Sequence, residues 1–199
     1  MAKRIDYYVF LASPWAYLGS QRLTEIAKRH GAEMRIIPMA AAEVFPVSGG
    51  LPLAKRAPQR QAYRIVELKR WRDFLGMPLN LQPQFFPMNE NLAARLVIAA
   101  RDAGLDAVGL AHAMMRAVWA EDRNIAEPEV LEEILTECGM DPAKLFAAAE
   151  TDGIKAEYAR GTQQAVEANV FGAPSYVIDG EIFWGQDRLD FVERRLARG

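Results

Sequence analysis

The sequence predicts an α/β fold in which short strands near the two ends of the chain enclose a long, mostly helical segment. A strand is expected at residues 4–11, because two sets of apolar side chains alternate there with a period of two. A hairpin is expected at residues 176–184, where Asp179-Gly180 has the composition of a tight turn. Between these ends, apolar residues recur with the 3.6-residue period of helices.

A helix is predicted to follow the first strand directly. Ser13 and Pro14 are residue types favoured at the N-cap and the first position of a helix. The helix is expected to continue to His30, where Gly31 ends it. A second, short strand is then expected over residues 34–38.

The middle of the chain is predicted to be a loop and then a series of helices. Residues 40–58 contain three prolines and a Gly49-Gly50 pair, which favour irregular structure. Beyond them the helical pattern recurs in short segments, and the first of these is expected to be amphipathic. These helices are expected over residues 59–75, 89–103, 105–121, 128–137, 142–149 and 153–168, with a last one from Leu189.

Ser13 and Pro14 also define a place that favours an anion. The first N–H groups of a helix have no partners within the helix, and the aligned peptide dipoles place about half a positive charge there. A phosphate, a carboxylate or a thiolate suits such a place. The alternative is that Ser13 only caps the helix.

A second loop is of interest because Pro174 stands immediately before the hairpin. A cis peptide bond between Ala173 and Pro174 would expose the backbone of Ala173 to a ligand. An ordinary trans turn is the alternative, since most X–Pro bonds in folded proteins are trans.

Composition argues against several classes of protein. The net charge is -2 at pH 7, without the basic surplus that nucleic-acid binding requires. Cys138 is the single cysteine, which excludes an internal disulfide, and two histidines without ligand spacing argue against a metal site. No apolar stretch approaches the roughly 20 residues of a membrane span. We therefore expect a soluble, cytoplasmic enzyme with a small-molecule partner and no membrane or nucleic-acid partner.

Five motifs, taken in order, resemble those of one enzyme family. They are Ser13-Pro14-Trp15-Ala16-Tyr17-Leu18-Gly19, Arg70-Trp71, Phe86-Pro87-Met88-Asn89, Phe171-Gly172-Ala173-Pro174 and Phe183-Trp184-Gly185-Gln186-Asp187-Arg188. In this order and approximate spacing, the chain resembles the 2-hydroxychromene-2-carboxylate isomerases and the kappa-class glutathione transferases of the thioredoxin-like superfamily. The resemblance implies a thioredoxin-like fold with a large all-helical insertion. Residues 1–40 and 169–199 are then expected to form the thioredoxin-like domain, and residues 41–168 the insertion, including the helix that leads back to the sheet.

The resemblance also implies that the reactive sulfur comes from a bound ligand. Ser13 and Ala16 occupy the places where redox members of the superfamily carry two cysteines, so this chain cannot perform dithiol exchange with its own side chains. The family supplies glutathione as cofactor, with its thiol over the helix N-terminus and Ser13 donating a hydrogen bond to it. A thiol of pKa about 8.5 is about 3% ionised at pH 7, and a fall of about two units makes most of it thiolate. Ser13 is thus the expected catalytic residue, as an activator of the bound thiol.

Further glutathione-binding residues follow from the same resemblance. The backbone of Ala173, beside Pro174, is expected to pair with the cysteinyl backbone of glutathione. Trp184, Gln186 and Asp187 are also expected to bind glutathione, the last two at its γ-glutamyl end. The family commonly has Ser where this chain has Gln186, and Asp187 is alternatively an N-cap of the last helix.

The second substrate is expected to contact Arg60, Tyr63 and Asn89. Related chains read Pro-Ala-Lys, with a Tyr three residues later, where this chain has Pro58-Gln59-Arg60 and Tyr63. An aromatic-substrate pocket has four candidate walls: Trp71, Phe85, Phe86 and Trp119. The alternative for these side chains is the hydrophobic core.

Together these expectations favour a glutathione-dependent isomerase. It would convert 2-hydroxychromene-2-carboxylate, or a similar aromatic-catabolism intermediate, to its ring-opened trans isomer through a transient glutathione adduct. One alternative is a kappa-like glutathione transferase or peroxidase, and another is a glutathione-binding module without turnover. The resembled families are dimers, so a homodimer is expected.

Overall fold

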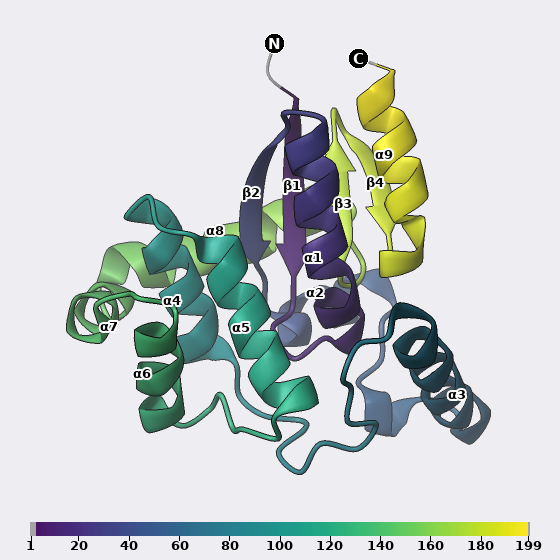
Figure 1. Cartoon of the computed structure of the whole chain (residues 1–199), viewed down its shortest axis with the longest axis horizontal. Helices are drawn as coiled ribbons and strands as arrows, with labels where there is room; N and C mark the ends of the chain where they lie inside the picture. Colours follow the sequence, from purple (N-terminus) through teal and green to yellow (C-terminus); the bar gives the residue numbers. More distant parts are fainter. Residues whose placement is uncertain (1–2, 199) are drawn as a thin grey trace.

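Four strands form one mixed sheet in the computed structural model, which describes residues 3–198 (Figure 1). The strands are β1 (Arg4–Val9), β2 (Glu33–Pro38), β3 (Ser175–Ile178) and β4 (Glu181–Trp184). Their order is β2-β1-β3-β4, with β1 parallel to β2 and antiparallel to β3. Both ends of the chain therefore contribute to the sheet, as predicted.

The alternation seen in the sequence of β1 corresponds to two buried faces. Ile5, Tyr7 and Val9 belong to the larger core, whereas Tyr8 and Phe10 belong to a smaller core on the other face. Strand β1 lies between β2 and β3, and its central position explains why its second half, Tyr7–Val9, is buried on both faces. It is the element from which the candidate site is built.

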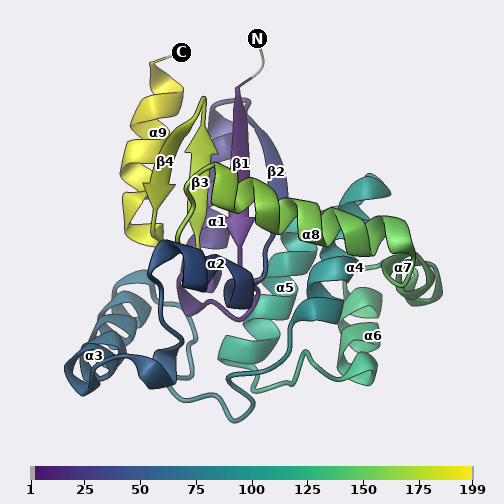
Figure 2. The same ribbon diagram turned by 180° about the vertical axis from the view of Figure 1, so that it is seen from behind.

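Helices cover both faces of the sheet. Helix α1 (Pro14–Arg29) lies over one face in Figure 1, and α8 (Asp152–Glu167) crosses the opposite face in Figure 2. Helix α9 (Leu189–Ala197) runs beside β4 in both views. The remaining helices are α2 (Ala41–Ser48), α3 (Pro58–Leu75), α4 (Asn91–Asp102), α5 (Ala107–Ala120), α6 (Pro128–Glu137) and α7 (Pro142–Ala149). None of the helices in residues 3–198 is both long and apolar enough to traverse a bilayer.

The prediction of a loop over residues 40–58 was wrong. This segment contains α2 and a short 3₁₀ helix, Leu53–Lys55. Pro46 lies inside α2, where it removes one backbone donor, but the fully buried side chain of Val44 anchors the helix. Gly49 then ends α2 in the left-handed conformation, with φ of 75°. Tertiary packing therefore outweighs the local proline signal.

Helix α3 is present as predicted, but it does not bury the apolar face that was expected of it. Leu68 is its only fully buried residue. Tyr63, Val66 and Phe74 are exposed. In Figures 1 and 2 the helix stands at the margin of the molecule, below the sheet.

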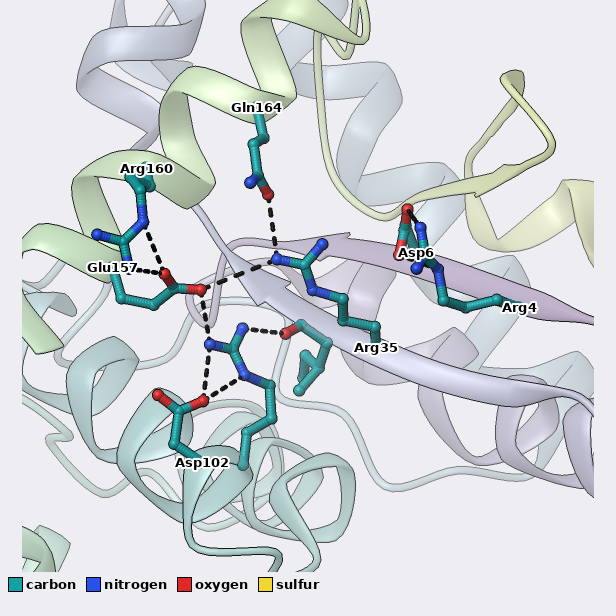
Figure 3. A network of polar contacts seen from close by, with 9 residues as sticks. Arg4, Asp6, Arg35, Asp102, Glu157, Arg160 and Gln164 are labelled. Atoms are coloured by element: carbon teal, nitrogen blue, oxygen red, sulfur yellow. Dashed lines mark hydrogen bonds and ion pairs between the residues drawn. The ribbon is translucent and has the colours of Figure 1, made fainter.

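A cluster of charged side chains joins α4, α8 and β2 (Figure 3). The Glu157 carboxylate lies 2.7 Å from the Arg101 guanidinium and accepts a 2.9 Å hydrogen bond from Nε of Arg160. Arg35 of β2 lies 3.9 Å from the same carboxylate and donates to Gln164. One anion is thus shared by three cations. Burial raises the pKa of Glu157, but the hydrogen bonds from Arg101 and Arg160 outweigh burial and hold the pKa below its ordinary value.

We expect Glu157→Gln to lower the free energy of unfolding by about 2 kcal/mol at neutral pH, because it removes the carboxylate that three guanidinium groups share and leaves Asp102, beside Arg101, to offset them. Since the folded-state pKa is depressed, this contribution is present above the unfolded pKa and is lost as the pH falls through the folded one. Urea unfolding at neutral and acidic pH measures both effects. Glu193→Gln is the matched control, because Glu193 forms an exposed pair with Arg29 and should contribute little. Equal losses in the two variants would contradict this role.

Candidate functional site

The site is centred on the turn between β1 and α1. Ser13 is the N-cap of α1, and its Oγ accepts a 3.2 Å hydrogen bond from the backbone N–H of Ala16. The Ser13 residue is 8% exposed, and the first turn of α1 contains no acidic residue. The predicted capping geometry is therefore confirmed. The positive end of the helix dipole has no neighbouring carboxylate on its own first turn.

The loop before β3 lies directly against this turn. The Ser13 hydroxyl is 3.3 Å from the carbonyl oxygen of Ala173, to which it donates, across 160 residues of sequence. The peptide bond between Ala173 and Pro174 is cis. Because β3 begins at Ser175, the N–H of Ala173 lies outside the paired strand. The structure thus places together the two motifs that the sequence analysis singled out.

Trp184 packs against the same loop. Its indole lies on Gly172, where an added Cβ would be 2.6 Å from Nε1 of Trp184. The ring of Phe171 meets the Trp184 ring with centroids 4.8 Å apart. Trp184 is 52% exposed, so part of its ring faces solvent beside the loop. A glycine is needed at position 172 because any larger side chain would displace this indole.

Gln186 packs against α1 at Gly19 and is 1% exposed. Arg22 of α1 donates to the side-chain oxygen of Gln186 and, at 3.1 Å, to its backbone oxygen. The side-chain Nε2 of Gln186 is buried without a hydrogen-bond partner among residues 3–198. A buried amide donor without a partner is costly, and a ligand acceptor would remove that cost.

The alternative interpretation of Asp187 as an N-cap was wrong. Gln186–Arg188 form a short 3₁₀ helix, and α9 starts at Leu189 with Arg188 at its N-cap position. The Asp187 carboxylate instead pairs with Arg188 at 3.0 Å. The same carboxylate also folds back over Gly185, whose φ of 106° is a backbone conformation that glycine adopts readily. The carboxylate remains exposed beside Gln186.

The three residues proposed for the second substrate stay predictions, and none of them hydrogen-bonds to Ser13 within residues 3–198. Arg60 and Tyr63 lie on α3 with exposed side chains, and Tyr63 is 58% exposed. Asn89 is also exposed, and its Oδ1 accepts a 2.9 Å hydrogen bond from the N–H of Asn91 at the start of α4. The Asn89 side chain therefore helps to start helix α4.

The four aromatic side chains divide between fully buried and half-buried positions. Trp119 is fully buried in the larger core, which is the alternative that the sequence analysis considered for it. Phe86 and Trp71 are half-buried and pack against that core. Phe85 is half-buried as well. Phe86 thus forms a partly accessible face over Trp119, with ring centroids 5.0 Å apart.

Glu90 is a site residue that sequence reasoning missed. Its Oε2 accepts a 2.5 Å hydrogen bond from the N–H of Ala12, the residue before Ser13. Burial raises the pKa of the Glu90 carboxyl to about 7, although hydrogen bonds from the backbone of Ala12 and Leu11 lower it. Glu90 precedes α4, where an acidic residue is common, and no local signal indicates contact with a turn 78 residues away.

No group of three or more His, Cys, Asp or Glu within residues 3–198 is arranged to hold a metal ion. A surface hollow of about 450 Å³ over α6 is lined by Glu129, Glu132, Thr136 and two further glutamates. Such a lining repels anionic ligands. The turn at Ser13 therefore remains the candidate site for an anion.

Comparison with known proteins shows the family of this chain. The family model described as "DSBA-like thioredoxin domain" matches residues 4–197. The chain belongs to this family of DSBA-like thioredoxin domains. The predicted thioredoxin-like fold is confirmed. The helices between β2 and β3 form a large helical insertion, as predicted. Its exact division at residues 40/41 and 168/169 stays a prediction.

Within this family, the chain is similar to named isomerases. It is 30% identical over 199 residues to a 2-hydroxychromene-2-carboxylate isomerase of Pseudomonas putida, covering 98% of this chain and 94% of that protein. A solved 2-hydroxychromene-2-carboxylate isomerase superposes with a TM-score of 0.79 at 28% identity, covering 98% of this chain and 95% of the other. Human glutathione S-transferase kappa 1 is 23% identical over 213 residues, covering 99% and 92%. The resemblance stated from the motifs is confirmed.

This DSBA-like domain has no cysteine at its α1 turn. Its single cysteine, Cys138, stands at the end of α6, and burial with the charges of Glu137 and Asp106 raises the pKa of its thiol. A raised pKa disfavours the thiolate at neutral pH. Any thiolate chemistry at Ser13 must therefore use a thiol from a ligand.

Proposed function

We propose that this protein is a homodimeric, glutathione-dependent isomerase that acts on 2-hydroxychromene-2-carboxylate or a similar aromatic-catabolism intermediate. The observation that carries the proposal is the contact between the Ser13 hydroxyl and the Ala173 carbonyl at the N-terminus of α1. It joins a helix dipole, a hydroxyl donor and the half-buried backbone of Ala173 in one place. The similarity to named isomerases supports the same activity.

The residues at this site fit glutathione. The backbone of Ala173 is available for strand-like pairing with a peptide. The unpartnered Nε2 of Gln186 suits an acceptor at the γ-glutamyl end, and the exposed Asp187 carboxylate suits its ammonium group. Trp184 offers a half-exposed apolar surface beside the loop. When bound, glutathione supplies a thiolate that adds reversibly to a conjugated carbon.

Ser13 favours the ionised form of a thiol placed at the turn. Its bond to Ala173 is long, at 3.3 Å, so the hydroxyl can exchange a weak neutral acceptor for a charged one at little cost. A lowering of the thiol pKa by two units requires about 2.7 kcal/mol. A charge-assisted hydrogen bond and the helix dipole together are of that size. Within residues 3–198 the Ser13 hydroxyl donates to a carbonyl and not to a base, so Ser13 acts by binding.

The decisive experiment follows the ultraviolet spectrum of 2-hydroxychromene-2-carboxylate with purified protein, with and without glutathione. The proposal expects conversion only when glutathione is present, while titration of free thiol before and after turnover gives the same amount. A spectrum that never changes with glutathione would contradict the assigned reaction.

The human kappa-class relative makes a transferase or peroxidase the second candidate. The two activities differ in the fate of the thiol, because transfer to an electrophile or reduction of a peroxide consumes it and isomerisation returns it. Loss of free thiol in step with product would favour the second candidate. Calorimetric binding of glutathione with no turnover of either kind would favour a binding module.

A further inference from the structure

Arg64 of α3 is held over aromatic rings. Its guanidinium carbon lies 5.5 Å from the centroid of the Phe86 ring and 5.6 Å from that of Trp119. A cation over aromatic faces is attracted by their quadrupoles, and a guanidinium is the side chain best suited to this position. Arg64 is half-buried there, whereas Arg60, one turn earlier, is exposed.

Arg64 differs from the other half-buried arginines of residues 3–198 because it bonds no acceptor in that part of the chain. All the rest bond a carboxylate, an amide oxygen or a backbone carbonyl, as Arg101 does with Glu157 and Arg22 with Gln186. Burial and the like charge of Arg56 lower the pKa of Arg64 to about 10, which leaves it protonated at neutral pH. A half-buried cation without an anion lacks the partner that would offset the cost of its burial.

Phe86, one of the two rings under Arg64, belongs to a segment that is attached to the first turns of α1 at both ends. At one end, the Tyr17 hydroxyl donates to the carbonyl of Pro78 at 3.0 Å. At the other end, Glu90 accepts the N–H of Ala12 at 2.5 Å. Phe86 is four residues from Glu90, a span of at most about 14 Å even if fully extended. Arg64 therefore contacts, through Phe86, the segment that borders the α1 turn.

We propose that Arg64 binds the carboxylate of a planar aromatic or conjugated acid, with Phe86 providing the apolar surface beside it. The N–H donors of a guanidinium lie in its own plane, so a guanidinium held by ring faces retains them for a bidentate carboxylate. The inference rests on the proposed function, since such an acid is the proposed second substrate. It assigns carboxylate recognition to Arg64 in place of the exposed Arg60.

Calorimetric binding of chromone-2-carboxylate in the presence of glutathione tests this assignment, because this stable acid resembles the proposed substrate without reacting. We expect Arg64→Gln to weaken binding roughly 10- to 100-fold, the usual worth of a bidentate charged hydrogen bond. Arg64→Lys should lie between Arg64→Gln and the unaltered protein, because it keeps the charge and loses the fork. Arg60→Gln is the matched control and should bind normally. The uncharged chromone-2-carboxamide should bind all variants alike.

Three outcomes would overturn the assignment: no binding of the acid by the unaltered protein, equal binding by Arg64→Gln, or equal weakening in Arg60→Gln. Circular dichroism of each variant shows whether it is folded, and Arg64→Lys decides the question if Arg64→Gln is not. The binding assay needs no turnover. Arg64-dependent binding without glutathione-dependent conversion of the chromene would therefore support the carboxylate site and contradict the proposed function alone.

Discussion

Replacing Ser13 by Ala should raise the pKa of bound glutathione by about one to two units and reduce turnover at pH 7 roughly 10- to 100-fold. The variant removes the side-chain hydroxyl that donates to the Ala173 carbonyl at the α1 turn. The remaining amides and the helix dipole still favour an anion, so the loss should be partial. Rate should recover at higher pH, because the thiol then ionises without help.

The pH dependence of kcat/KM and the ultraviolet absorbance of the bound thiolate measure this shift. Folding should be largely intact, since a lost cap costs about 1 kcal/mol. Thr24→Ala is the matched control: Thr24 lies on α1, and its hydroxyl donates to the Ser20 carbonyl, away from the turn. An unchanged thiolate titration in Ser13→Ala would contradict the role of Ser13.

Glu90→Gln should remove a large pH dependence from the stability of the fold. The pKa of the Glu90 carboxyl is about 7 in the folded protein, against 4.5 ordinarily, so the folded state binds this proton more tightly. Stability is then greatest below the unfolded pKa and falls by about 2–3 kcal/mol as the pH rises from about 4.5 to 7. Gln retains an oxygen that can accept the N–H of Ala12, and it does not ionise.

Urea unfolding of both proteins across this pH range gives the difference directly, because other titrating groups cancel. Above pH 7 the variant should be the more stable protein. Glu127→Gln is the matched control, since Glu127 is an exposed glutamate at the N-cap position of α6 and its replacement should leave the pH dependence unchanged. Parallel stability curves for Glu90→Gln and the unaltered protein would show that the carboxyl is not held as described.

Features that depend on near neighbours in sequence were predictable. The Ser13-Pro14 helix start and the Asp179-Gly180 hairpin turn are both present, with φ of 51° and 81° at the two turn residues. Capping and turn formation are decided within a few residues, so the sequence contains the necessary information. The helices α6 and α7 were predicted with their observed bounds for the same reason.

Features that depend on packing across the chain were not predictable from local pattern. The contact between Ser13 and Ala173 was expected only from the resemblance to a family. Nothing in the sequence places Glu90 against Ala12 or Arg64 against Trp119, because these contacts arise from how the insertion folds back on α1. Residues 40–58 and Asp187 were misjudged where a residue type with a strong local preference was overruled by its neighbours in space.

A crystal structure with bound glutathione would show where the sulfur lies. We expect the cysteinyl sulfur within hydrogen-bond distance of the Ser13 hydroxyl, over the first turn of α1, with the cysteinyl backbone paired to Ala173. A tripeptide bound with its sulfur remote from Ser13 would show that Ser13 is not the thiol site. So would a turn at Ser13 that stays empty at saturating glutathione.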